Sequence, residues 1–82
     1  MYHLITGGSS GLGYEIAKLL VLMDEPVILI GRQVDKLKKA TDALKDLSKQ
    51  ADVLSYSLDI AIEEDIDAFV ETLVTSGKKV KN

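Results

Sequence analysis

Apolar residues in this chain gather in stretches whose spacing alternates between that of strands and that of helices. Residues 1–6 are mostly apolar and end in a glycine and serine cluster, which predicts a buried strand followed by a turn. Residues 27–30 form an uninterrupted apolar run that is rich in β-branched residues, which is typical of a parallel strand covered on both faces, and Gly31 closes it. Residues 53–58 indicate a third strand.

Three stretches with helical spacing follow these strands. The first covers residues 12–23, the second residues 37–47 and the third residues 63–75, which Gly77 ends. The third helix begins with acidic residues that suit its macrodipole, but no polar cap precedes it. The side chains that we expect to face the core are Leu12, Ile16, Leu19, Leu20 and Met23 in the first helix, Leu37, Ala40, Leu44 and Leu47 in the second, and Ile62, Ile66, Phe69, Val70 and Leu73 in the third.

The order of these elements, strand and helix in alternation, specifies right-handed crossovers in a parallel sheet. The sequence therefore predicts an α/β fold with about three parallel strands in the order 3-2-1 and helices on both faces. In such sheets the ligand crevice lies beyond the carboxyl ends of the strands, where Gly7, Gly31 and Asp59 are expected to converge. Residues 78–82 are expected to form a basic, frayed tail.

The composition narrows the classes of function. The 82 residues carry a net charge of −3, which disfavours nucleic-acid binding because affinity for phosphate backbones needs a basic face. The absence of cysteine excludes disulfides and thiolate metal sites, and it fits a cytoplasmic protein. His3 has no cysteine or acid at ligand spacing, so we expect a packing or hydrogen-bonding role and no metal site. We expect neither a signal peptide nor a membrane helix.

The strongest signal for function is the run Thr6-Gly7-Gly8-Ser9-Ser10-Gly11-Leu12-Gly13 between the first strand and the first helix. Gly7 permits a tight turn, Gly11 lets the backbone approach a diphosphate, and Gly13 lets the helix pack closely on the sheet. Amide groups at the start of the helix then face the anion. An ordinary strand-to-helix turn seldom needs three glycines at fixed spacing together with two serine hydroxyls.

This run resembles the T-G-x-x-x-G-x-G fingerprint of the short-chain dehydrogenase/reductase family. Residues 19–32 resemble the end of that family's first helix and its second strand, and Leu58-Asp59-Ile60 resembles the end of its third strand. The resemblance implies a Rossmann-type half-domain over residues 1–77, in three layers, that binds a nicotinamide dinucleotide. It also implies that Gly7, Ser9, Ser10, Gly11, Leu12 and Gly13 hold the ribose and diphosphate, and that Asp59 and Ile60 meet the adenine.

The end of the second strand bears on the choice of cofactor. An NAD site would place an acid there to accept from the ribose 2′-OH, but Gly31 occupies that position. Arg32 follows it, and a guanidinium suits a 2′-phosphate, with positive potential added by Lys36 and by Lys38 or Lys39. We therefore expect NADP, with NAD as the alternative if Arg32 is only a surface residue that begins a loop. Asp59 is also open to two interpretations, since a strand-end aspartate often satisfies loop amides.

The family's catalytic residues are a serine and a Tyr-x-x-x-Lys pair on a later helix, and the sequence in hand ends before that region would begin. Tyr14 and Lys18 match the spacing of the pair, but they lie in the first helix, and we interpret the match as coincidence. We therefore expect an NADP(H)-binding portion of an oxidoreductase, truncated before its catalytic residues and inactive alone. A non-catalytic interaction fragment is the alternative. We also expect a homo-oligomer, a dimer, formed through an exposed edge of the first strand.

Overall fold

The computed structural model describes residues 1–7, 11–77 and 80–81. Its strands are β1 (Tyr2–Thr6), β2 (Val27–Gly31), β3 (Val53–Ser57) and β4 (Val80–Lys81). Its helices are α1 (Gly11–Leu22), α2 (Val34–Leu47) and α3 (Glu63–Ser76). The six predicted elements are confirmed with small shifts at their ends, of which the largest is the start of α2, three residues before Leu37.

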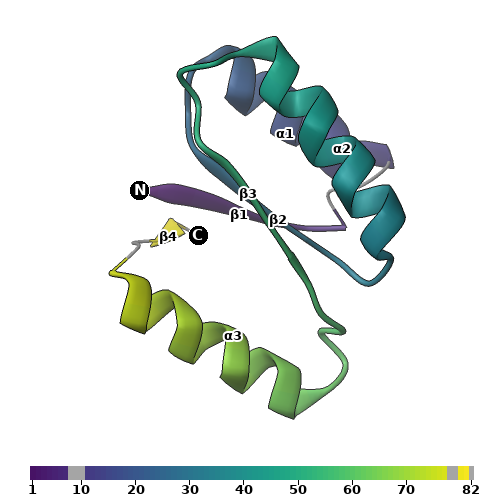
Figure 1. Cartoon of the computed structure of the whole chain (residues 1–82), viewed down its shortest axis with the longest axis vertical. Helices are drawn as coiled ribbons and strands as arrows, with labels where there is room; N and C mark the ends of the chain where they lie inside the picture. The colour runs from purple at the N-terminus through teal and green to yellow at the C-terminus, as the bar shows by residue number, and fades with distance from the viewer. Residues whose placement is uncertain (8–10, 78–79, 82) are drawn as a thin grey trace.

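The sheet is parallel in the order β3-β2-β1-β4, so the predicted order 3-2-1 is confirmed and extended by one strand. Helices α1 and α2 cover one face of the sheet and α3 covers the other, which makes three layers (Figure 1). Strand β2 lies in the middle of this arrangement, and its residues 27–30 are at most 3% exposed. The prediction that this strand is covered on both faces is therefore correct.

Strand β4 lies within residues 78–82, which we expect to form a basic, frayed tail, and it shows that residues 80 and 81 pair with the sheet, whereas residues 78, 79 and 82 lie outside the described residues. Val80 pairs with Tyr2 and Lys81 pairs with His3, so part of the outer edge of β1 is occupied. Figure 1 shows this short strand beside β1, near the amino terminus. Because β4 pairs with Tyr2 and His3, the β1 edge is not free at these two residues for the homo-oligomer that we expect. A single valine among lysines carries no strand periodicity, so only the pairing with β1 reveals this strand.

Two clusters of apolar side chains form the core, one on each face of the sheet. Ala17 and Val21 of α1 and Leu37, Ala40 and Leu44 of α2 pack on the odd-numbered residues of the strands. On the other face, Phe69 and Leu73 of α3 pack on even-numbered strand residues, and the Phe69 ring meets Tyr56 edge-on with centroids 5.0 Å apart.

The predicted inward faces of the helices are only partly correct. In α1, Leu20 is half-buried, but Leu12, Ile16 and Leu19 are exposed, as is Met23 just after the helix. The smaller Ala17 and Val21 lie against the sheet instead. Small side chains let the helix approach the sheet closely while it also contacts α2. Leu47 of α2 is also exposed, and so are Ile62, Ile66 and Val70, which we expected to be buried with α3.

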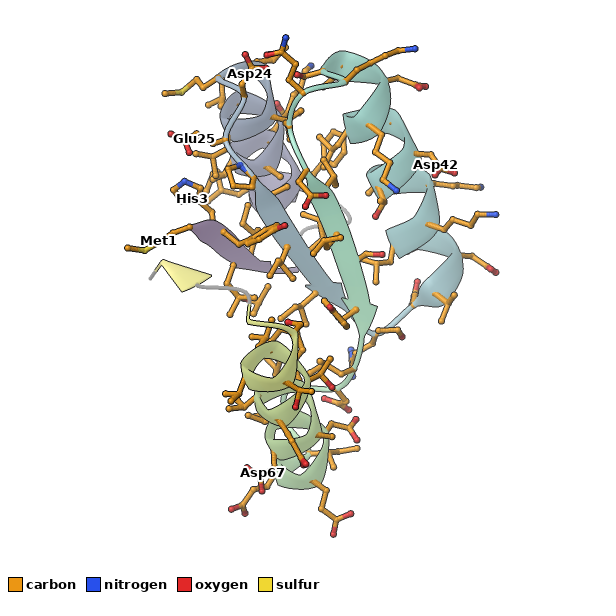
Figure 2. The ribbon with its side chains drawn as sticks, turned by 60° about the vertical axis from the view of Figure 1, so that its left-hand side comes forward. Met1, His3, Asp24, Glu25, Asp42 and Asp67 are labelled. Carbon is orange, nitrogen blue, oxygen red and sulfur yellow. The ribbon has the colours of Figure 1, made fainter. Side chains whose placement is uncertain are left out.

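At the amino ends of the strands, opposite the predicted crevice, polar groups join neighbouring segments. The Tyr2 hydroxyl donates a hydrogen bond to the Asp52 carboxylate, and this bond raises the pKa of Tyr2. His3 Nε2 lies 3.6 Å from Glu25 Oε2, and Figure 2 shows the two residues side by side. His3, for which we expect a packing or hydrogen-bonding role, thus has the acidic Glu25 as a neighbour, and the spacing of the two residues in the sequence did not indicate this.

Candidate nucleotide-binding site

An open cavity of about 510 Å³ lies at the carboxyl ends of β1, β2 and β3. Thr6 and Gly7 at the end of β1, Gly31 and Arg32 at the end of β2, and Asp59 after β3 all contribute to its lining. The carboxyl ends of parallel strands meet at one edge of a sheet, so three segments that are distant in sequence come together here. The predicted convergence of Gly7, Gly31 and Asp59 is confirmed.

The glycine-rich turn adopts backbone conformations that favour glycine. Gly7 has a φ angle of +66° and Gly11 a φ angle of +63°, both in the left-handed region. A Cβ atom at either position would meet nothing within 4 Å, so the backbone conformation, and not lack of space, calls for glycine. The Gly7 amide donates to Ile30 O at 2.9 Å and ties the turn to β2. Ser9 and Ser10, which we expect to contact the nucleotide, lie outside the described residues.

Helix α1 starts at Gly11, so the predicted residues Leu12 and Gly13 lie in its first turn. The first amides of a helix have no partner inside the helix and carry its positive partial charge. This turn follows the β1 strand, whose end lines the cavity. Gly11, Leu12 and Gly13 are not among the cavity-lining residues, so phosphate binding at this helix start stays a prediction.

The β2 end of the cavity is basic. Arg32, Gln33 and Lys36 line it together with Gly31, and no acidic residue lies at the strand end. The Arg32 side chain is 75% exposed, which leaves its guanidinium accessible to an anion. Lys38 and Lys39 are exposed but are not among the lining residues, so only Lys36 of the three lysines contributes to the lining. Gln33 also lines the cavity but was not predicted as a site residue, although its position directly after Arg32 could have indicated it.

Asp59 makes local and cross-cavity contacts. Its Oδ1 accepts a hydrogen bond from the Ala61 amide at 2.9 Å, so it does satisfy a loop amide, one of the two interpretations of its role. Its Oδ2 lies 4.0 Å from Arg32 Nη1. Contact with adenine, the other interpretation, stays a prediction. Ile60 beside it is 55% exposed and lines the cavity.

Tyr14 and Lys18, which match the catalytic Tyr-x-x-x-Lys spacing, are not among the cavity-lining residues. Tyr14 packs against the core between α1, α2 and the sheet. Within residues 1–7 and 11–77, no group of three or more potential ligands is placed to hold a metal ion. None of the helices in the described part of the chain is long and apolar enough to cross a membrane.

The parallel sheet, the glycine turn and the cavity at the strand ends define a Rossmann-type nucleotide-binding fold. The model of the short chain dehydrogenase family matches residues 2–81. The chain belongs to this family.

Individual relatives agree with this assignment. The chain is 39% identical over 72 residues to a PIGF/3-ketodihydrosphingosine reductase fusion protein of Schizosaccharomyces pombe, with 85% of this chain and 15% of the relative covered. It is 42% identical over 62 residues to the uncharacterized oxidoreductase DltE of Bacillus subtilis, with 74% of this chain and 25% of the relative covered. The chain thus spans a quarter or less of the length of these two relatives.

Solved structures show the same fold. The L-sorbose reductase of Gluconobacter frateurii, complexed with NADPH and L-sorbose, superimposes with a TM-score of 0.82 and 37% identity over 92% of this chain and 28% of that chain. A short-chain dehydrogenase of Sphingobium yanoikuyae in complex with NADPH superimposes with a TM-score of 0.79 and 28% identity, covering 88% of this chain and 28% of that one. Similarity to such proteins supports a nucleotide-binding portion of an oxidoreductase.

Proposed function

We propose that this chain binds the adenosine end of NADP(H), as the cofactor-binding portion of a short-chain dehydrogenase. The observation that carries this proposal is that Arg32 and Lys36 line one cavity together with Gly7, the first glycine of the turn, while Gly31 stands where an NAD site has an acid. Two cations suit a 2′-phosphate, and an acid at the strand end would repel it. The complexes of two relatives with NADPH agree with this preference.

Each part of the nucleotide has a proposed partner. Arg32 pairs with the 2′-phosphate, with Lys36 adding positive potential. Asp59 and Ile60 contact the adenine from the β3 side of the cavity. The ribose and diphosphate are held by the turn and the start of α1, through Gly7, Ser9, Ser10, Gly11, Leu12 and Gly13. When bound, the cofactor supplies hydride-transfer chemistry, and the residues of this chain bind and orient its adenosine end.

We further propose that the chain alone does not catalyse turnover. Proton transfer to a substrate needs an acid within hydrogen-bond reach of the reacting group. Tyr14 belongs to the packed face of α1, and no part of the proposed nucleotide contact involves it. We also propose a cytoplasmic location, which fits the absence of cysteine from the sequence.

A protein-interaction or oligomerising fragment is the second candidate, and one observation favours it. Apolar side chains of α1 remain exposed, among them Leu12 at 78%, Leu19 at 63% and Leu22 at 54%. Exposed apolar surface of this kind commonly marks a contact with another polypeptide. In this candidate function, the glycine turn is inherited from a nucleotide-binding protein but binds no nucleotide.

Thermal unfolding with and without 2′,5′-ADP separates the two candidates. A ligand that binds only the folded chain must raise its melting temperature, by an amount that grows with ligand concentration. The nucleotide-binding proposal predicts a rise with 2′,5′-ADP and a smaller one with 5′-ADP. An unchanged melting temperature at a ligand concentration of about 1 mM, a hundredfold above a tight 10 µM site, would favour the interaction fragment.

A further inference from the structure

The loop between β3 and α3 is held by an acid that does not line the cavity. Asp65 Oδ2 accepts a hydrogen bond from the Asp59 amide at 3.2 Å, and this bond is partly buried. Asp65 lines a separate pocket together with Tyr56 and Phe69 and is not among the lining residues of the cavity, so we do not expect a nucleotide in the cavity to touch it. Its carboxylate therefore acts on the site only through Asp59.

Helix α3 explains why this bond matters. Ile62, the residue that precedes the helix, makes no capping hydrogen bond with its side chain, and the loop before it has no serine or threonine to do so. Asp65 is the third residue of the helix, the position from which an acid reaches back to the capping residue in a capping box. Here it reaches three residues further, to the amide of Asp59. The bond thus fastens the end of β3 to the first turn of α3.

Three hydrogen bonds then fix the conformation of Asp59. Asp65 accepts from its amide, the Ala61 amide donates to its Oδ1 at 2.9 Å, and the Ile62 amide donates to its carbonyl oxygen at 3.0 Å. With the backbone and Oδ1 held in this way, Oδ2 is the oxygen left on the side of Arg32. The direction of this carboxylate is consequently set by Ala61, which lines the cavity, together with Ile62 and Asp65, which do not.

We infer that Asp65 is a positioning residue for adenine recognition: it fixes the β3–α3 loop so that the Asp59 carboxylate meets the 6-amino group of the base. The inference rests on the proposed function, because it assigns Asp59 to the adenine. An oriented carboxylate accepts a hydrogen bond from an amino group, whereas the 6-oxo group of hypoxanthine offers an acceptor in its place. Asp65 therefore contributes to the choice between these bases.

The test compares NADP⁺ with deamino-NADP⁺, which carries hypoxanthine, by calorimetric titration. The variants are Asp65→Ala, Asp65→Asn, which keeps an acceptor oxygen, and Glu64→Ala, which removes an exposed acid from the same helical turn. Amide hydrogen exchange of Asp59 is measured by NMR on each variant without nucleotide, because exchange reports local opening directly. The ratio of the two dissociation constants is insensitive to a general loss of stability.

In the wild type we expect a protected Asp59 amide and tighter binding of NADP⁺ than of deamino-NADP⁺. Asp65→Ala should speed exchange at Asp59 and shrink the preference for adenine by about three- to tenfold, a part of the roughly tenfold or more that a hydrogen bond to a charged group contributes. Asp65→Asn and Glu64→Ala should leave both nearly unchanged. Unchanged exchange in Asp65→Ala, or faster exchange with an unchanged preference, would overturn the positioning role alone. If the wild type binds neither dinucleotide, the proposed function fails, and the role in adenine recognition fails with it.

Discussion

Arg32 and Asp59 approach each other from different strand ends, with Arg32 Nη1 4.0 Å from Asp59 Oδ2. The Arg32 side chain is 75% exposed, so solvent screens this pair, which contributes at most about 1 kcal/mol to stability. Its consequence lies in binding. In the proposed site, a carboxylate beside the guanidinium partly offsets the positive potential that a 2′-phosphate would meet, so we expect Asp59 to oppose phosphate binding there.

Substituting Asp59→Asn tests this opposition. The amide keeps an oxygen that accepts from the Ala61 amide, but it removes the negative charge near Arg32. We expect the preference for NADP⁺ over NAD⁺ to rise by about two- to fivefold at low salt, and by less at high salt, as for a screened charge. Titration calorimetry at two ionic strengths measures both. Asp67→Asn is the matched control, because Asp67 projects from the outer side of α3 (Figure 2); an equal effect there would assign the change to net charge.

The glycine turn and the end of α3 provide a matched pair of glycines. Gly7 and Gly77 have φ angles of +66° and +73°, and a Cβ atom at either would meet nothing within 4 Å. Substitution by alanine should therefore cost each about 1–2 kcal/mol of unfolding free energy, from the left-handed conformation alone. Only Gly7→Ala should also weaken NADP⁺ binding, since only Gly7 lines the cavity. Urea unfolding and titration measure the two effects, and equal loss of binding in Gly77→Ala would remove Gly7 from the site.

Stability at alkaline pH should depend on Tyr2. Its hydrogen bond to Asp52 raises its pKa, so the folded chain favours the protonated phenol. The contribution is complete below about pH 10, where an unfolded tyrosine titrates, and it is lost as the pH rises through the higher pKa of the folded state. Urea unfolding from pH 8 to 11 should show a wild-type advantage over Tyr2→Phe that narrows above about pH 10. Tyr56→Phe serves as the control, and an advantage that grows with pH would contradict the assignment.

We expect no catalytic turnover by this chain alone, because its proposed role is to bind the adenosine end of the cofactor. Mixed with NADPH and carbonyl compounds, the chain should oxidise NADPH no faster than a blank, as followed by absorbance, because no identified acid is placed to protonate a substrate. Turnover that disappears in Tyr14→Phe would show that the Tyr14 and Lys18 pair is functional, and it would refute this proposal.

The sequence predicted the layout of the fold well, for a physical reason. Residues 27–30 were predicted as a strand covered on both faces because a continuous apolar run rich in β-branched residues is most stable when both of its faces are buried. The glycine turn was equally readable, because Gly7 and Gly11 both need left-handed backbone angles. Features of this kind depend on residues that are adjacent in the sequence, so the sequence alone predicts them.

What the sequence could not predict depends on contacts between distant segments. Helix α1 is apolar on several sides, so its periodicity led us to predict Leu12 and Leu19 as core residues. In the structure, the residues that pack on the sheet are Ala17 and Val21. Strand β4 exists only as a partner of β1. In the site, the bond from the Asp59 amide to Asp65 crosses a loop that has no conventional helix cap, and no spacing rule points to it.

The most direct test of the account is calorimetric titration of NADP⁺, NAD⁺ and 2′,5′-ADP into the wild type, Arg32→Ala and Lys39→Ala. Lys39 is an exposed cation of α2 outside the cavity lining, so its variant controls for net charge. The account predicts that 2′,5′-ADP binds the wild type about as well as NADP⁺, and that NAD⁺ binds roughly tenfold more weakly, the equivalent of 1.4 kcal/mol. It predicts that Arg32→Ala abolishes this preference and Lys39→Ala preserves it. Equal affinity of the wild type for NADP⁺ and NAD⁺ would contradict the 2′-phosphate site.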